Sequence, residues 1–480
     1  MVPTHAHFEA PGSSERPAGP CGRSGGPDPL LSRSSVLPLR ALCVSVVLLL
    51  AVSPLVATAD DLYLPLVRLW SAAGGSPRPW PDTNTGIHVF NDQLAYGLSE
   101  AQTQFAATHY AGAQKLTRSQ ADQLRAISPG FIVLHYRLGE GLGYRSVTDG
   151  CRPDGDWLAI VDGDDWVQEW PGDEGASASW FFPWSGSDRV LDCDWGWYLM
   201  ELGDPSWRAY WHGEVLRQVR ANADDGVFMD SLSVPNSLGT FDPPLPPLDL
   251  TFESAWSTRI AAWLSWLQSQ PLGAYYLVPN VGSWITTRDV TDYSAADGLM
   301  VEGFAIEADA SPYALEDWRL QMNRILGATA RGQAVVGQTC ALGDQERMFT
   351  LGSYLLAKGA RSYLNLDNGL DPEWWPEYDI PIGRPTEGAR TSIEDLYDDV
   401  AGVYRRAFDN GFVLVNPTNP WDGSGTTAIV DLGGTYYLAE CSRGGYLPED
   451  GVPTGSVTYR RVSSVTLPPY STAVLLDRQP

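Results

Sequence analysis

Two acidic residues each follow a short apolar run that has the character of a buried strand. Asp230 follows Gly226–Met229, and Glu302 follows Gly298–Val301. In a barrel of parallel strands, the residues that follow the strands gather on one face. A carboxylic acid and a carboxylate that flank one bond can cleave a glycosidic linkage, because one protonates the leaving oxygen while the other attacks the anomeric carbon or activates water. The pattern predicts Asp230 as nucleophile or base and Glu302 as general acid.

Both carboxylates also have structural interpretations. Asp230 could cap the start of a following helix, a role that Ser231 could share. No helix signal follows Glu302, and a carboxylate at the end of a buried strand costs free energy unless it is paired or functional. The functional interpretation is therefore favoured for the pair.

Other polar residues stand at or just after the ends of apolar runs. Because they would share the face that carries the two carboxylates, we expect them to hold the hydroxyl groups of a sugar. These candidate substrate-binding residues are Asn91, Asp92, Tyr136, Arg137, Asn280, Gln338, Asn365 and Asp367.

Eight apolar runs alternate with helical patterns and define the fold class. Each run is apolar enough to be buried on both faces, which is typical of parallel strands. We therefore expect a (β/α)8 barrel of the TIM type. An open doubly wound sheet is the alternative, but no glycine-rich phosphate turn follows any run. The runs are 87–90, 110–114, 131–136, 226–229, 274–278, 298–301, 334–336 and 361–366.

Three of the helical patterns are well defined. Apolar residues recur at spacings of three or four, which places them on one helical face. The first stripe is Trp207, Trp211 and Val215 behind Pro205, the second is Trp256, Ile260, Trp263, Leu264 and Leu267, and the last is Ile393, Leu396, Val400 and Val403.

Two regions depart from the alternation. The segment 145–203 is a tryptophan-rich insertion, and loops of this length usually carry function. Its Trp195 and Trp197 are expected to stack on sugar rings, although they could equally cover the helices of the barrel. After residue 409 short β runs separated by Gly, Pro and Asn predict an antiparallel β-sandwich. We expect an N-terminal extension and signal peptide over 1–59, a barrel over 60–408 and a β-domain over 409–480.

The charge and the N-terminal segment bear on partners and compartment. The net charge of −26 argues against nucleic acid or an anionic membrane as partner. An apolar run from Ala41 to Ala51 follows Arg40 and precedes the small residues Ala57–Ala59, which is the pattern of a signal peptide cleaved before Asp60. An uncleaved anchor and a start codon placed too far upstream remain alternatives. We expect a secreted protein with no transmembrane domain after cleavage.

Four cysteines follow the signal segment. In an oxidising compartment they could form two disulfides in three possible connectivities, of which the pairing of Cys151 with Cys193 is favoured because it would staple one long loop. Their wide spacing, without a histidine pair, argues against zinc. No motif for a metal or phosphate site occurs, and no cofactor is expected.

Four segments resemble a known group of proteins. They are Asp225–Ser231 (DGVFMDS), Tyr276–Asn280 (YLVPN), Met300–Phe304 (MVEGF) and Gly411–Pro417 (GFVLVNP). The chain resembles the barrel proteins classed as hypothetical glycosyl hydrolase family fifteen and, more distantly, endo-α-1,4-polygalactosaminidases. The resemblance implies a nucleophile or base on the fourth strand and an acid on the sixth, followed by a C-terminal β-domain. Those roles fall on Asp230 and Glu302. The tryptophan-rich insertion departs from the group and leaves the substrate open.

Together these features predict a secreted glycoside hydrolase that acts on O-glycosidic bonds of a polysaccharide or oligosaccharide. Two rivals use the same fold: a carbohydrate-binding barrel without catalysis, and a cell-surface adhesion protein. A carboxylate pair in a sequence does not separate them.

Overall fold

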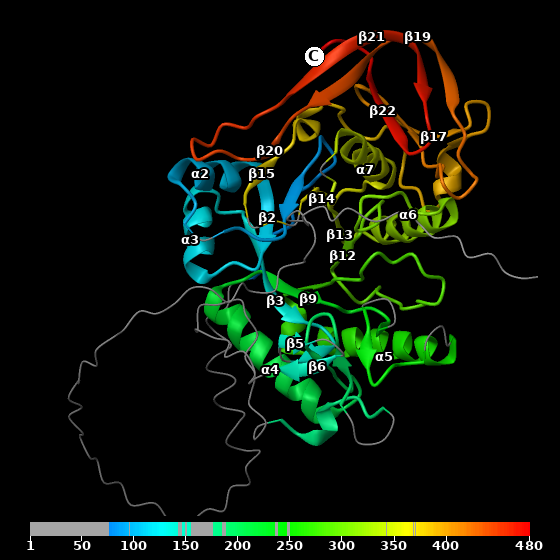
Figure 1. Ribbon diagram of the computed structural model, residues 1–480. Coiled ribbons are helices and arrows are strands. Elements are labelled where there is room, and N and C mark those ends of the chain that lie inside the picture. The colour runs from blue at the N-terminus through cyan, green and yellow to red at the C-terminus, as the bar shows by residue number, and fades with distance from the viewer. Residues whose placement is uncertain are drawn as a thin grey trace, which may run out of the picture.

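The computed structural model describes residues 76–480 apart from 96, 143–145, 149–150, 155–175, 185–188, 236–238, 247–249, 342, 368 and 370. The predicted signal peptide, and Trp157, Trp166 and Trp170 of the insertion, lie outside the described residues. The described chain forms a barrel with a C-terminal antiparallel sheet at one end of the molecule (Figure 1).

Eight parallel strands form the barrel in the order β11-β9-β3-β2-β1-β14-β13-β12. The outer strands of this order also meet, because the Val281 amide donates to the Met300 carbonyl at 2.9 Å and the Asp297 amide donates to the Leu277 carbonyl at 3.0 Å. The predicted (β/α)8 barrel is confirmed, and each of the eight predicted runs overlaps a barrel strand. The strands are β1 (Val89–Asn91), β2 (Tyr110–Gln114), β3 (Ile132–Leu138), β9 (Gly226–Asp230), β11 (Tyr276–Pro279), β12 (Gly298–Glu302), β13 (Ala334–Gln338) and β14 (Ser362–Asn365).

Side chains alternate between the inside of the barrel and the surrounding helices, as the pleat of a strand requires. Phe90, Phe228 and Met300 belong to the inner cluster, together with Ile132, Leu134, Tyr136, Val278, Val336 and Tyr363. Their neighbours Val89, Val227 and Val301 belong to the outer core against the helices. The barrel is therefore filled by side chains, and this alternation decides which strand-end residues face inward.

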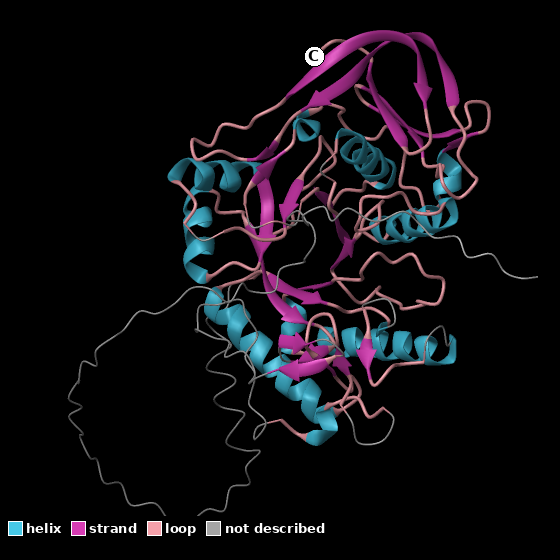
Figure 2. Cartoon of the chain, in the orientation of Figure 1, coloured by secondary structure: helices cyan, strands magenta, loops and turns pink. Residues whose placement is uncertain are grey.

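Six α-helices surround the barrel within the described part of the chain (Figure 2). Local signals in the sequence start some of them: Ser99 with Gln102 and Thr117 with Gln120 form capping boxes at the starts of α2 and α3. The predicted apolar stripes of α4 and α5 are buried, as expected. The helices are α2 (Glu100–His109), α3 (Arg118–Ile127), α4 (Pro205–Asn222), α5 (Leu250–Gln268), α6 (Leu315–Ala330) and α7 (Asp344–Ala357).

The insertion between β3 and β9 adds small sheets and one disulfide. A four-stranded sheet joins β4 (Gly141–Leu142), β7 (Leu191–Asp192), β8 (Tyr198–Leu199) and β10 (Phe241–Asp242), while β5 (Ser146–Thr148) pairs with β6 (Arg152–Asp154). Cys151 and Cys193 are joined by a disulfide, so the favoured pairing is confirmed. Cys340 and Cys441 are not joined by one.

A six-stranded antiparallel sheet completes the fold, in the order β16-β17-β18-β22-β19-β21. Its long strands β19 and β21 arch over the end of the molecule (Figure 1). Helix α7 approaches β22 so closely that a Cβ on Gly352 would lie 2.2 Å from the Thr472 hydroxyl, so this position needs glycine. The predicted C-terminal β-sandwich is confirmed. The strands are β16 (Tyr397–Asp398), β17 (Val403–Phe408), β18 (Gly411–Asn416), β19 (Ala428–Ser442), β21 (Ser456–Leu467) and β22 (Ser471–Leu476).

Short elements connect these parts. They are the 3-10 helices η2 (Ala178–Trp180), η4 (Pro271–Ala274), η5 (Pro376–Asp379) and η6 (Ile393–Leu396), and the paired strands β15 (Glu373–Trp374) and β20 (Gly445–Tyr446).

The last predicted helix, with Ile393, Leu396, Val400 and Val403 on one face, is wrong. The chain forms η6 and then the hairpin of β16 and β17. The Asp398 side chain accepts hydrogen bonds from the Val400 and Ala401 amides, and Gly402 adopts a φ of 68°, so the chain turns where a helix would continue. Val400 is fully exposed as a result. The antiparallel sheet thus starts at Tyr397, before the predicted boundary at 408/409, and the division into domains remains a prediction.

Candidate active site

A ring of eight polar side chains lines the carboxyl-terminal mouth of the barrel, one from the end of each strand. In each strand, the polar side chain lies two residues beyond a residue that faces the inside of the barrel, or lies beside such a position on the neighbouring strand. We call this set the strand-end ring. Its members are Asp92, Gln114, Tyr136, Asp230, Asn280, Glu302, Gln338 and Asn365.

Asn280 connects the two carboxylates of the ring. Its Nδ2 donates to Asp230 Oδ1 at 2.8 Å and to Glu302 Oε2 at 2.6 Å. Its Oδ1 accepts a hydrogen bond from the Gly282 amide at 3.0 Å, which fixes the orientation of the amide group. The sequence predictions for Asp230, Asn280 and Glu302 therefore describe residues that lie in contact.

Asp230 has further donors. The Tyr136 hydroxyl donates to Oδ2 at 2.8 Å and the Ser231 amide donates to Oδ1 at 2.9 Å. Ser231 has a φ of 51°, a left-handed conformation that directs its amide back to the carboxylate. Three donors thus hold the Asp230 carboxylate in one orientation.

Glu302 is in a different environment. Burial, and after it the negative charge of Asp230, raise the pKa of Glu302 to about 7, while the Asn280 hydrogen bond opposes the rise. The loop that follows is fixed by Gln321 of α6, whose Nε2 donates to the Gly303 carbonyl at 3.0 Å. Glu302 can therefore carry a proton near neutral pH beside a partner held by three donors, which is the division of roles that acid catalysis requires.

Two residues at the mouth, Gln114 and Lys115, were missed by the sequence analysis. Lys115 donates to Asp92 Oδ2 at 3.0 Å, and Gln114 donates to the other oxygen of the same carboxylate. Burial alone lowers the pKa of the Lys115 ammonium, but the three carboxylates of the ring raise it above its ordinary value. One signal existed in the sequence, because Lys115 and Lys358 are the lysines of a chain that otherwise uses arginine.

Several predicted substrate-binding residues do not face the mouth. Alternation places Asn91 on the outer side with Val89, and Arg137 on the outer side with Val133. Both are buried among the packing between strands and helices. The prediction that they line the site is wrong, because each precedes or follows an inward residue by one position.

The remaining predicted residues divide between the strand-end ring and positions outside it. Trp197 is 1 % exposed and packs edge-on against Phe241, so its indole has no free face for a sugar and the predicted stacking role is wrong. Trp195 is half-buried against the outer core. Asp367 lies beyond β14, where its side chain accepts the Gly369 amide. Gln338 and Asn365 pair in register with Glu302 and with each other and belong to the ring.

The sequence of the barrel matches a known family over more than half of the chain. The model of hypothetical glycosyl hydrolase family 15 matches residues 125–412, a range that includes Asp230, Asn280 and Glu302. The chain belongs to this family. It is therefore a glycoside hydrolase with a carbohydrate substrate, and no curated protein matches the family 15 chain closely enough to say more.

Solved structures resemble the chain only distantly. A cycloisomaltooligosaccharide glucanotransferase from Paenibacillus sp. is 10% identical with a TM-score of 0.35, over 82% of this chain and 55% of its own. A noncanonic maltogenic α-amylase from Thermotoga neapolitana is 10% identical with a TM-score of 0.36, over 81% and 98%. A GH31 family sulfoquinovosidase from E. rectale is 12% identical with a TM-score of 0.40, over 86% and 65%. The family 15 chain thus spans about half the glucanotransferase, and likenesses this distant say nothing about its substrate.

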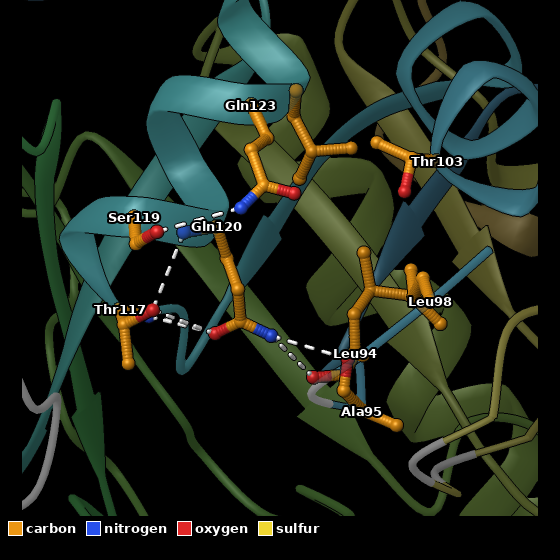
Figure 3. Close-up of a pocket in the computed structure, with 10 residues that line it drawn as sticks. Leu94, Ala95, Leu98, Thr103, Thr117, Ser119, Gln120 and Gln123 are labelled. Carbon is orange, nitrogen blue, oxygen red and sulfur yellow. Dashed lines mark hydrogen bonds between the residues drawn. The ribbon is translucent and has the colours of Figure 1, made fainter. Parts of the chain in front are cut away.

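A cavity of about 180 Å³ lies between the loop after β1 and helix α3, and neither Asp230 nor Glu302 lines it (Figure 3). Gln120 crosses it, with Nε2 donating to the Leu94 and Ala95 carbonyls and Oε1 accepting from Thr117. These polar groups satisfy one another, so the cavity has a structural role in joining the loop to the helix.

The described residues show neither a metal-binding cluster nor a membrane-spanning helix. No group of three or more His, Cys, Asp or Glu side chains among them is arranged to hold a metal ion. None of the described helices combines the length and the apolar character that crossing a bilayer requires.

Proposed function

We propose that this family 15 protein is a secreted, retaining glycoside hydrolase, with Asp230 as nucleophile and Glu302 as general acid and base. The observation that carries the proposal is the Asn280 amide shared by the two carboxylates. Since one nitrogen makes both contacts, the two carboxylate oxygens lie at most about 5.4 Å apart. Retaining glycosidases hold their carboxyl groups about 5–5.5 Å apart, and inverting enzymes about 6.5–9.5 Å apart to admit a water.

The protonation of the pair supports the same roles. Three hydrogen-bond donors hold the Asp230 carboxylate in one orientation, as suits a nucleophile that must attack from a fixed position. Glu302, with a pKa raised to about 7 by burial and by Asp230, retains its proton in mildly acidic and neutral solution. The retaining mechanism needs one ionised and one protonated carboxyl at the start of the reaction.

The reaction then follows in two balanced steps. An Asp230 oxygen attacks the anomeric carbon while Glu302 gives its proton to the glycosidic oxygen, so the C–O bond breaks and a glycosyl ester forms on Asp230. The Glu302 carboxylate next takes a proton from water, the water oxygen attacks the anomeric carbon, and Asp230 leaves as a carboxylate. Asn280 contacts both carboxylates throughout and keeps them at the working distance.

The charge of the mouth favours sugars that are neutral or positively charged. Three of the eight ring side chains are carboxylic acids and none is cationic. The ammonium of Lys115 beside the ring is engaged by Asp92, and Arg137 faces the outer core. A uronic acid or sulfated sugar would therefore meet carboxylates without a free counter-charge, in a protein of net charge −26.

Secretion is supported by two features. The sequence pattern from Arg40 to Ala59 is that of a signal peptide. The disulfide between Cys151 and Cys193 suits an oxidising compartment.

The test incubates the chain from Asp60 with neutral, amino-sugar and acidic polysaccharides and follows products by mass spectrometry. Proton NMR of the first product reads its anomeric configuration. We expect cleavage of a neutral or amino-sugar polymer with retention, and a loss of about 10²–10⁴-fold in Glu302→Gln. Glu307→Gln, which removes a carboxylate further along the same loop, is the matched control. Inversion would make Asp230 a base that activates water, and binding without cleavage by any variant would favour the carbohydrate-binding barrel.

A further inference from the structure

A second cavity, of about 200 Å³, lies between the loops that follow β9 and β11. It is lined by residues of the loops that leave β9 and β11, so it opens just beyond the strand ends that carry Asp230 and Asn280. Among its lining residues are Ser233, Ser283, Trp284, Thr286, Arg288 and Asp289. Hydroxyl, guanidinium and carboxylate groups are the types that bind sugar hydroxyls.

This cavity adjoins the residue that follows Glu302. A Cβ added to Gly303, which has a φ of 80°, would lie 3.2 Å from the Ser283 Cβ and 2.9 Å from the Tyr313 hydroxyl. The same Gln321 amide that holds the Gly303 carbonyl also donates to the Ser283 carbonyl at 2.6 Å. One side chain of α6 therefore ties the wall of the cavity to the loop of the general acid.

The wall is rigid and locally strained. Trp284 has a φ of 56°, a left-handed conformation that is rare for a bulky side chain. Arg324, one helical turn beyond Gln321 on α6, maintains it by donating to the Trp284 carbonyl at 2.6 Å and to the Thr286 carbonyl at 3.0 Å. Backbone strain of this kind persists where the surroundings over-determine it, and it concentrates at ligand sites.

We propose that this cavity binds the departing sugar, on the reducing-end side of the bond that is cleaved. The inference rests on the proposed function, because it assigns the leaving side from the role of Glu302. The acid must reach the glycosidic oxygen, so the leaving sugar lies against the acid and its loop, opposite the face that Asp230 attacks. The loop that starts at Ser283 is one of the segments that contact the Glu302 loop directly, and it carries the wall of the cavity.

The electrostatics of the cavity agree with a neutral or amino sugar. Asp289 is buried and accepts the Thr291 amide at 2.9 Å, with Ser233 and Ser257 hydroxyls at 3.4 and 3.5 Å. Arg288 is paired with buried Glu253 at 2.7 Å. The guanidinium is therefore already balanced, and the half-buried Ser283 and Thr286 hydroxyls are the groups of the wall that a sugar would meet.

The polysaccharide panel first identifies the glycosyl unit that the protein cleaves. The test then compares two substrates that carry this unit. One is an oligosaccharide, whose leaving group is a sugar, and the other is the glycosyl fluoride, whose leaving group is fluoride. Ser283→Phe places an aromatic ring in the cavity. We expect the ratio of kcat/KM for the oligosaccharide to that for the fluoride to fall at least tenfold. Thr286→Phe fills the same cavity from a half-buried position and guards against misfolding of the first variant.

The matched control is Ser119→Phe, which makes the same substitution at the cavity of Figure 3. Its ratio is expected to equal that of the wild type. If kcat/KM falls equally for both substrates in Ser283→Phe and Thr286→Phe, or changes for neither substrate, the cavity does not bind the leaving sugar. If the wild type cleaves neither substrate, the proposed function itself fails, and the two failures are thereby distinguished.

Discussion

The ammonium of Lys115 donates to the Asp92 carboxylate at 3.0 Å, with the two side chains 7% and 4% exposed. A buried pair of this kind is costly to break, because the remaining charge loses its partner without regaining water. The pair also acts on Glu302, since the Asp92 charge raises the pKa of Glu302 and the Lys115 charge lowers it.

Asp92→Asn is expected to shift the basic limb of the pH profile of kcat/KM. With the Asp92 charge removed and the Lys115 charge kept, the pKa of Glu302 falls below about 7, so activity is lost at lower pH than in the wild type. Urea unfolding should show a loss of about 3–5 kcal/mol from the unpaired ammonium. The double variant Asp92→Asn/Lys115→Met should recover part of both effects. An unshifted limb in Asp92→Asn would show that this charge does not act on Glu302.

Asn280→Ala and Tyr136→Phe are expected to differ in their pH profiles. Both remove a donor to Asp230, but only Asn280 also donates to Glu302. Because that hydrogen bond lowers the pKa of Glu302, its loss moves the basic limb to higher pH, while Tyr136→Phe leaves the limb in place. Each variant should lower kcat by about 10–100-fold, given a lost charge-assisted hydrogen bond of about 1.5–3 kcal/mol. If the basic limb lay at the same pH in both variants, the Asn280 amide would not act on the pKa of Glu302.

Asp192 is expected to make the protein less stable as pH rises. Burial raises the pKa of Asp192 from 3.8 to about 7, while the Trp195 and Asp194 amides oppose the rise. The folded state thus binds the proton more tightly than the unfolded state. Its stabilising contribution is complete below pH 3.8 and is lost as pH rises through about 7. At a rate of about 1.4 kcal/mol per pKa unit, the loss is on the order of 4 kcal/mol.

Asp192→Asn tests this directly, because an amide oxygen can still accept from the two backbone amides but does not titrate. The difference in free energy of unfolding between wild type and variant should fall between pH 4 and pH 8. A difference independent of pH would show that Asp192 titrates normally in the folded protein.

Reduction of the disulfide is expected to destabilise the insertion and the barrel it covers. The bond closes a loop with a sequence separation of 42, for which the chain-entropy account predicts about 4 kcal/mol. Dithiothreitol should lower the Tm of the wild type, and the variant Cys151→Ala/Cys193→Ala should have the lower Tm with or without the reductant. A wild-type Tm that does not respond to reduction would mean that the loop stabilises nothing beyond itself.

The strand-end ring shows how far sequence patterns reach. Seven of its members were predicted, because a polar residue after an apolar run marks the end of a barrel strand. Gln114 was missed because its strand, Tyr110–Gln114, is weakly apolar and its last residue was counted within the strand. Neighbours were harder to separate: Asn91 and Asp92 both follow the first run, and only the pleat of β1 decides that Asp92 faces inward.

Tertiary packing decides what spacing alone does not. Trp197 was expected at the sugar site, but its ring covers Gly141 and packs on Phe241 inside the insertion. The stripe that ended at Val403 had helical spacing, yet a local turn at Asp398 and the pairing of β17 with β18 overrode it. In both cases a partner distant in sequence or a side-chain-to-backbone bond outweighs the periodic pattern.

The burial of both lysines has a practical consequence for chemistry done on this protein. Lys115 is 7% exposed at the mouth of the barrel, and Lys358 is 2% exposed at the opposite end, where its ammonium contacts the Thr83 carbonyl. The folded protein therefore offers amine-directed labels and cross-linkers no lysine at its surface. Any label that reaches these two positions reports an opening of the barrel, and the position that reacts first tells which end opened.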